Sequence, residues 1–174
     1  MIRTDRLVLR RWKPEDLSEY SQICGDPKVM RWIADCSLKT RKQTEDEIAK
    51  FEQHWAEHEF GLFAVELLAS ARLTGFVGPS IPRFLPEILF AVEIGFRLAR
   101  DLWGRGLATE GSRAVMDFGF KQIGLDRIVS ICHVRNTPSR RIMEKLGMRL
   151  ERETVVPGTG NPVQVCAIER PDWS

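Results

Sequence analysis

A short glycine-containing turn is the segment of this sequence with the clearest capacity for ligand chemistry. Residues 104–109 read Gly-Arg-Gly-Leu-Ala-Thr and lie between a predicted strand and a predicted helix. Small residues let a ligand approach the backbone closely, and the unpaired N–H groups in the first turn of a helix attract anions such as pyrophosphate. The dinucleotide fingerprint requires glycine where Thr109 stands, and the phosphate loop requires Gly-Lys-Ser/Thr, so neither motif matches. On its own, the turn could equally serve to reverse the chain.

A glutamate on the preceding strand is a second candidate for chemistry. Residues 90–98 alternate in polarity, which puts Glu93 on one face and the apolar side chains on the other: Phe90, Val92, Ile94, Phe96 and Leu98. This pattern predicts a strand at the centre of a sheet. Glu93 could act as a general base, directly or through a water molecule. Alternatively, it could hydrogen-bond to the backbone or pair with an arginine such as Arg97.

The elements that would position these residues follow a mixed order of strands and helices. Alternating and β-rich runs predict strands over 6–10, 60–68, 73–77, 90–98, 127–133, 149–156 and 163–170. Helical spacing predicts helices over 14–24, 44–58, 107–123 and 137–147, with a capping box at Thr44 and Glu47, an N-cap at Thr137 and a C-cap at Gly124. Prolines make 79–89 a loop.

Length and composition describe an ordinary globular chain. At 174 residues, with 43% hydrophobic and 29% charged residues, it fits one domain, 1–174, with a core that needs no disulfide. No apolar run reaches the roughly 18 residues of a membrane span, and no signal-peptide core follows the first residues, so we expect a cytoplasmic protein without membrane partners. The four cysteines show no C-x-x-C spacing, which indicates buried or half-buried thiols in a reducing compartment.

The charge is unevenly distributed along the chain. Its net value is +2, yet residues 96–145 carry ten Lys or Arg against five Asp or Glu. Such an excess suits a small ligand with several phosphates, or is simply a solvated face. No nucleic-acid-binding motif accompanies it, so we expect no nucleic-acid partner.

Taken together, these pieces resemble the GNAT superfamily of acyl-CoA transferases. The family signature Gln/Arg-x-x-Gly-x-Gly/Ala falls on 103–108, where Gly106 and Ala108 match and Trp103 replaces the usual Gln or Arg. The Trp-Gly-x-Gly variant is similar to the branch that acetylates the N-termini of ribosomal proteins. Further matches span most of the chain in the family's order: Thr4-Asp5-Arg6-Leu7-Val8-Leu9-Arg10, Gly75-Phe76-Val77-Gly78, Glu93-Ile94-Gly95, Asn136 with Ser139, and Lys145-Leu146-Gly147-Met148.

The resemblance implies an α/β (α+β) GNAT fold, in which about four helices flank a twisted, mixed, mostly antiparallel sheet with splayed central strands. It implies acetyl-CoA as co-substrate and no metal. The pantetheine arm would pair with the backbone of 96–98 near Asn136, and the amides of 105–109 would hold the pyrophosphate. The predicted cofactor-binding set is Ile94, Phe96, Arg97, Leu98, Trp103, Gly104, Arg105, Gly106, Leu107, Ala108, Thr109, Asn136, Ser139 and Lys145.

The implied reaction is direct attack of a primary amine on the thioester. Glu93 is the candidate base, and a backbone N–H within 94–96 could hold the oxyanion. Many similar enzymes have a tyrosine as general acid where this chain has Met143, so Ser139 becomes the candidate acid. Ser139 could instead satisfy the start of a helix, and a thiol of pKa about 8.5 can also leave as thiolate.

The acceptor is the least determined part of the prediction. An α-amine, with a pKa of about 7.7–8.0, is far easier to neutralise than lysine at about 10.4, which favours a protein N-terminus or a small, weakly basic amine. Polyamines, aminoglycosides and amino acids remain open. Trp32 is the one residue we assign to the mouth of the acceptor site. The sequence does not determine the oligomeric state; similar enzymes are frequently dimers, so a homodimer is one partner state left open.

Two other functions compete with this one. His54, Glu57 and His58 match the H-x-x-E-H pattern of inverted zinc peptidases, although such a site needs a further acidic ligand, and the simpler interpretation is an amphipathic helix with surface histidines. A non-catalytic acyl-CoA-binding or regulatory module is the second alternative, because Trp103 and the missing tyrosine could signal loss of activity.

Overall fold

The computed structural model describes residues 1–173. Eight strands in this part of the chain form one sheet in the order β1-β2-β3-β4-β5-β6-β8-β7. The strands are β1 (Ile2–Arg3), β2 (Leu7–Arg10), β3 (Phe63–Leu67), β4 (Leu73–Ser80), β5 (Val92–Leu98), β6 (Arg127–His133), β7 (Arg149–Val155) and β8 (Pro162–Glu169). All neighbours are antiparallel except β5 and β6, which are parallel.

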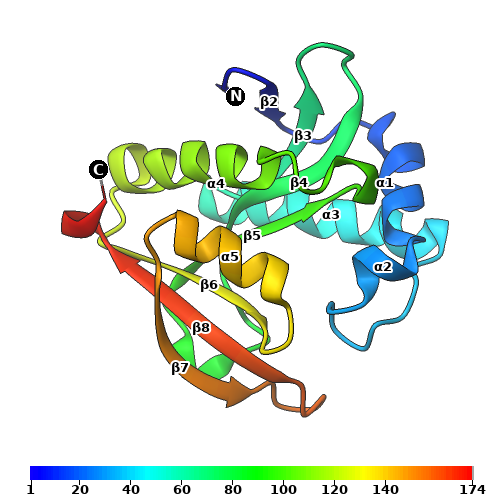
Figure 1. The fold of residues 1–174 in the computed structure, drawn as a ribbon. Helices are drawn as coiled ribbons and strands as arrows, with labels where there is room; N and C mark the ends of the chain where they lie inside the picture. Colours follow the sequence, from blue (N-terminus) through cyan, green and yellow to red (C-terminus); the bar gives the residue numbers. More distant parts are fainter. Residues whose placement is uncertain (174) are drawn as a thin grey trace.

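The helices cover both faces of this sheet (Figure 1). They are α1 (Asp16–Cys24), α2 (Pro27–Met30), α3 (Arg41–His58), α4 (Leu107–Phe118) and α5 (Thr137–Lys145), and a π-helical turn (Gly119–Ile123) extends α4. Phe76 of β4 contacts Tyr20 of α1 and Phe51 of α3, whereas the adjacent Val77 lies against Gly111 of α4. Because neighbouring residues of a strand point to opposite faces, α1 and α3 lie on one side of the sheet and α4 on the other.

The two central strands separate soon after they meet. Within the described residues, β5 and β6 pair at Val92 with Ile128 and at Glu93 with Val129, and the ladder goes no further. On its other edge, β5 stays paired with β4 from Glu93 to Leu98. The backbone of β5 from Ile94 onward therefore has one free edge, which faces the gap between the strands.

Two predicted helix starts are wrong, each because another side chain forms the cap. The capping box of α3 is built by Thr40 and Gln43 rather than by Thr44 and Glu47. Thr44 instead donates its hydroxyl proton to the carbonyl of Thr40 at 3.0 Å. In α5 the cap is Asn136, whose side chain accepts from the Ser139 N–H at 3.3 Å, and not Thr137.

The remaining differences lie at the ends of strands. Strand β4 continues through Pro79 to Ser80, into the predicted loop. Strand β5 begins at Val92, because Phe90 has a positive φ of 80° and is fully exposed, so it does not belong to the apolar face. Among the thiols, Cys24, Cys132 and Cys166 are buried as predicted, whereas Cys36 is exposed. No helix in residues 1–173 is long and apolar enough to cross a membrane.

Candidate active site

A cavity of about 100 Å³ lies where β5 and β6 separate. Its walls come from four places in the chain: the segment after α2, strand β5, strand β6 and the start of α5. The lining residues are Trp32, Ile33, Ile94, Gly95, Phe96, Ser130, Ile131, Cys132, Asn136 and Ser139. Five of them were predicted from the sequence, namely Ile94, Phe96, Asn136, Ser139 and Trp32.

One side chain spans the gap at its narrow end. The Ser130 hydroxyl on β6 donates to the carbonyl of Ile94 on β5 at 2.9 Å, and Ser130 is 2% exposed. This bond takes the place of a backbone bond at the point where the ladder stops, so it fixes where the free edge of β5 begins. The backbone beyond Ile94 keeps the unpaired groups that an extended amide-containing ligand could meet.

Glu93 lies one residue before the cavity lining and is 8% exposed. Burial raises the pKa of its carboxyl to about 7, although a hydrogen bond from the Ile131 backbone lowers it. A carboxyl of this pKa is partly ionised near neutral pH, as a general base requires. The expected alternative of a Glu93–Arg97 pair is wrong, because Arg97 pairs with Glu47 at 3.1 Å.

Asn136 and Ser139 together form the start of α5 that faces the cavity. The Asn136 side chain holds the Ser139 N–H, which fixes the turn of backbone that carries Ser139. The Ser139 hydroxyl makes no hydrogen bond within residues 1–173, so it is free to donate a proton into the cavity. The Met143 side chain, on the same helix, is 1% exposed and belongs to the core.

Trp32 lies at the cavity between an arginine and a histidine. Its ring centroid is 4.8 Å from that of His133 on β6, and the Arg31 guanidinium lies 4.7 Å from the Trp32 ring centroid. This arrangement places an aromatic surface and a positive charge beside the site. Neither His133 nor Arg31 was predicted, because only the three-dimensional structure brings the end of β6 next to the segment after α2.

The glycine turn connects the end of β5 to α4. Gly104 and Gly106 have φ values of +76° and +78°, a conformation that other residues rarely adopt, and Gly106 is the N-cap of α4. The Trp103 indole N–H donates to the Leu98 carbonyl at 2.9 Å, which ties the turn to the end of the strand. Trp103 therefore has a structural contact where the family signature has Gln or Arg.

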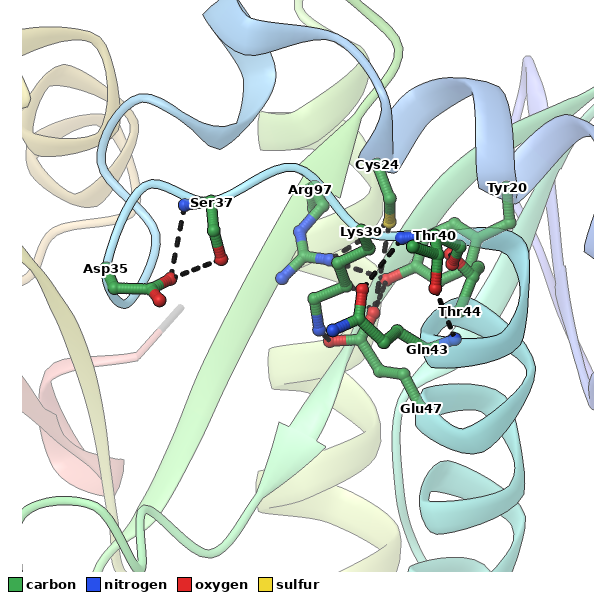
Figure 2. A network of polar contacts seen from close by, with 10 residues as sticks. All are labelled: Tyr20, Cys24, Asp35, Ser37, Lys39, Thr40, Gln43, Thr44, Glu47 and Arg97. Carbon is green, nitrogen blue, oxygen red and sulfur yellow. Dashed lines mark hydrogen bonds and ion pairs between the residues drawn. The ribbon is translucent and has the colours of Figure 1, made fainter.

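The side chain of Arg97, a predicted cofactor-binding residue, points away from the gap into a buried polar network. Figure 2 shows its guanidinium beside the Tyr20 hydroxyl, the Cys24 thiol and Glu47. Glu47 also pairs with Lys39 at 2.5 Å. Burial raises the pKa of Glu47, but the opposing effect of Arg97 and Lys39 is larger, so the pKa lies below its ordinary value.

One further predicted cofactor-binding position, Lys145, lies apart from the cavity. Lys145 is exposed at the end of α5, where its carbonyl accepts from Arg113 at 3.3 Å.

A larger open hollow of about 580 Å³ lies between α1 and the β3–β4 hairpin. Its acids have other partners there, since Glu19 accepts from the Leu73 N–H and Asp101 pairs with Arg72.

The zinc-peptidase pattern does not form a metal site. His54 and His58 pack against each other with ring centroids 4.4 Å apart, and both contact Phe60. Within residues 1–173, no group of three or more His, Cys, Asp or Glu side chains could hold a metal ion. The pattern is an accident of an amphipathic helix.

Comparisons with known proteins agree with this geometry. A family model described as an acetyltransferase (GNAT) domain matches residues 6–149. The uncharacterized N-acetyltransferase p20 of Bacillus licheniformis is 27% identical over 148 residues, which cover 85% of this chain and 82% of the relative. A GNAT-family acetyltransferase from Bacillus anthracis superimposes with a TM-score of 0.82 at 26% identity, over 98% of both chains. RimL, a ribosomal L7/L12 alpha-N-protein acetyltransferase solved with coenzyme A, shares the fold with a TM-score of 0.79 at 14% identity, over 95% of each chain.

A sheet that opens between two parallel central strands, with a glycine-opened helix at the end of one of them, is the arrangement that the resemblance to acyl-CoA-dependent transferases implies. The chain belongs to the GNAT family and is an acetyl-CoA-dependent N-acetyltransferase. The family and fold class predicted from the sequence are thereby confirmed.

Proposed function

We propose that this enzyme transfers the acetyl group of acetyl-CoA to the α-amine of a protein or peptide N-terminus. The observation that carries the proposal is the free edge of β5 in the gap, with Glu93 on the strand itself and Ser139 across the cavity. The proposal treats 1–174 as one catalytic domain that acts in the cytoplasm.

The pantetheine arm would lie along the free edge of β5. The Phe96 N–H and carbonyl and the Leu98 N–H face the gap and would bond the pantetheine amides, and Asn136 borders the same cavity. The pyrophosphate would lie at the start of α4, where positive-φ glycines leave the amides of 105–109 accessible. These contacts would bring the thioester to the narrow end of the gap, near Ser130.

Glu93 would accept the proton of the amine, directly or through a water molecule, as nitrogen attacks the thioester carbonyl. A backbone N–H of 94–96 would stabilise the oxyanion. The C–S bond then breaks. The thiolate takes a proton from the Ser139 hydroxyl, which regains one from protonated Glu93 through water, or it leaves as thiolate and takes up the proton that Glu93 releases to solvent. The balance is one amide formed, one thioester broken and one thiol released.

The charge at the cavity mouth supports an acceptor with a single amine. The Arg31 cation over Trp32 repels polyamines, which carry several positive charges, more than it repels a peptide with one weakly basic amine. RimL, which shares this fold, acts on a protein N-terminus according to its description.

The direct test is a thiol-release assay with acetyl-CoA and a matched acceptor panel. We expect turnover with N-terminal peptides, weaker turnover with the same peptides when only a lysine amine is free, and least with spermidine. A higher kcat/KM with polyamines or aminoglycosides would contradict the α-amine assignment. Coenzyme A binding without turnover on any acceptor would instead favour the non-catalytic module.

A further inference from the structure

The N-terminal residues 4–6 hold the turn that precedes α4, although they are about a hundred residues away in sequence. The Arg6 guanidinium donates to the carbonyl of Arg105 at 2.8 Å, inside the glycine turn. The same side chain forms an ion pair with Glu110 at 2.6 Å. A Cβ atom placed at Gly106 would lie 3.5 Å from the Arg6 guanidinium, so the arginine lies against the turn.

Glu110 is the acid whose charge this contact neutralises. It stands in the first turn of α4 and is fully bonded: one oxygen accepts from the Thr4 hydroxyl at 2.6 Å and from the Arg6 backbone N–H at 2.9 Å, and the other accepts from the Arg6 side chain. Burial raises the pKa of Glu110, but the opposing effect of these bonds is larger, so the pKa lies below its ordinary value and the group stays ionised. An unpaired carboxylate here would repel an anion bound at the start of the helix.

We propose that Arg6 is a positioning residue for the pyrophosphate end of acetyl-CoA. It fixes the 104–106 backbone through its bond to the Arg105 carbonyl. It also neutralises the charge of Glu110, so that this carboxylate does not repel the pyrophosphate from the amides at the start of α4. The inference rests on the proposed pyrophosphate site and assigns a function to the Thr4–Arg10 segment that the sequence match left without one. Arg6 acts through the turn and need not touch the reacting atoms.

The test compares binding of coenzyme A and of pantetheine, which lacks the pyrophosphate and adenosine, by calorimetry. In Arg6→Gln, the coenzyme A affinity should fall about tenfold, the scale of a lost charge-assisted contact, while the pantetheine affinity is unchanged. Arg11→Gln is the matched control, because Arg11 also pairs with a carboxylate and is similarly exposed, at 51% against 49% for Arg6. It should leave both affinities unchanged. Exposed ion pairs contribute little to stability, so both variants should fold.

Each other outcome would overturn the assignment. An unchanged coenzyme A affinity in Arg6→Gln would show that the contact does not serve the ligand. An equal loss for coenzyme A and pantetheine would show a general distortion of the fold. A wild-type enzyme that binds pantetheine but gains nothing from the pyrophosphate end would exclude a pyrophosphate site at α4, and absence of binding to either ligand would overturn the proposed function itself.

Discussion

Burial of Glu93 suits the residue to act as a base and destabilises its ionised form in the folded protein. Its carboxyl is almost completely removed from water, and the burial that raises its pKa to about 7 is what makes it partly ionised near neutral pH. The same burial disfavours the ionised form in the folded protein. Activity and stability should therefore respond to this residue with opposite signs.

The first prediction concerns the pH dependence of the reaction. Because the amine must lose its proton to an ionised Glu93, kcat/KM should rise with pH through an apparent pKa near 7. In Glu93→Gln this rise should vanish and the rate fall by about 10²- to 10⁴-fold, while titration of the acceptor amine near 8 remains. Glu153→Gln, an exposed glutamate on β7, is the control. A variant that keeps the rise near 7 would exclude Glu93 as the base.

The second prediction concerns stability. The pKa of Glu93 is higher in the folded protein, about 7, than in the unfolded chain, about 4.3. Its contribution to the free energy of unfolding is therefore fully present below about pH 4.3 and is lost as the pH rises through about 7. At pH 8, the free energy of unfolding of Glu93→Gln should therefore be about 3–4 kcal/mol higher than that of the wild type. At pH 4 the two proteins should be nearly equal. Urea unfolding at both pH values measures this, and a variant that is equally destabilised at both would contradict it.

At the scale of elements, the sequence predicted the types of helices and strands better than their ends. The bounds of β6, β7 and β8 were predicted to within one residue at each end. The cap of α3 was misplaced because two overlapping patterns, at Thr40 and at Thr44, compete for the same helix start. The Ser130 and Cys132 walls of the cavity could not be predicted, since they depend on how far β5 and β6 pair before they separate.

The third prediction concerns the polar network that joins α1, α3 and β5. Arg97 is 9% exposed, and its Nε has no hydrogen-bond partner within residues 1–173. Its buried positive charge is therefore compensated mainly by the ion pair with Glu47. Glu47→Gln should lower the free energy of unfolding by about 3 kcal/mol, as expected when a buried pair loses one member. Glu45→Gln, which removes an exposed pair with Lys42, should have little effect.

The double variant Arg97→Met with Glu47→Met separates pairing from packing. With both charges removed, no buried group is left uncompensated, and much of the lost stability should return. Urea unfolding of all four proteins gives the coupling between the two residues. Additive losses would contradict the interpretation of the network as a charge pair.

At the scale of the whole molecule, the sheet consists of two halves that share few backbone bonds. Strands β1 to β5 form one half, and β6, β8 and β7 form the other. In residues 1–173 the hydrogen bonds between them are the short β5–β6 ladder, the Ser130 bond and the bond from the Ile131 backbone to Glu93. A resemblance to the family implied this splay, but composition and periodicity did not. Helix α4 packs against β2, β4 and β5 in one half, α5 packs against β6 in the other, and the two helices contact each other (Figure 1).

The last prediction follows from this weak junction. Coenzyme A that lies along β5 and contacts α5 would connect the two halves of the sheet. Its binding should therefore raise the free energy of unfolding of the whole domain. At 100 times its dissociation constant, a ligand that binds only the folded state adds about 2.7 kcal/mol, which corresponds to a rise in Tm of roughly 5–11 °C for a chain of this length. Hydrogen exchange should slow most at the amides of 95–98 and 130–132, whereas the β2–β3 ladder, distant from the gap, should change little. Uniform slowing across the sheet would show stabilisation without occupation of the gap, and slowing confined to the α1 hollow would place the ligand elsewhere.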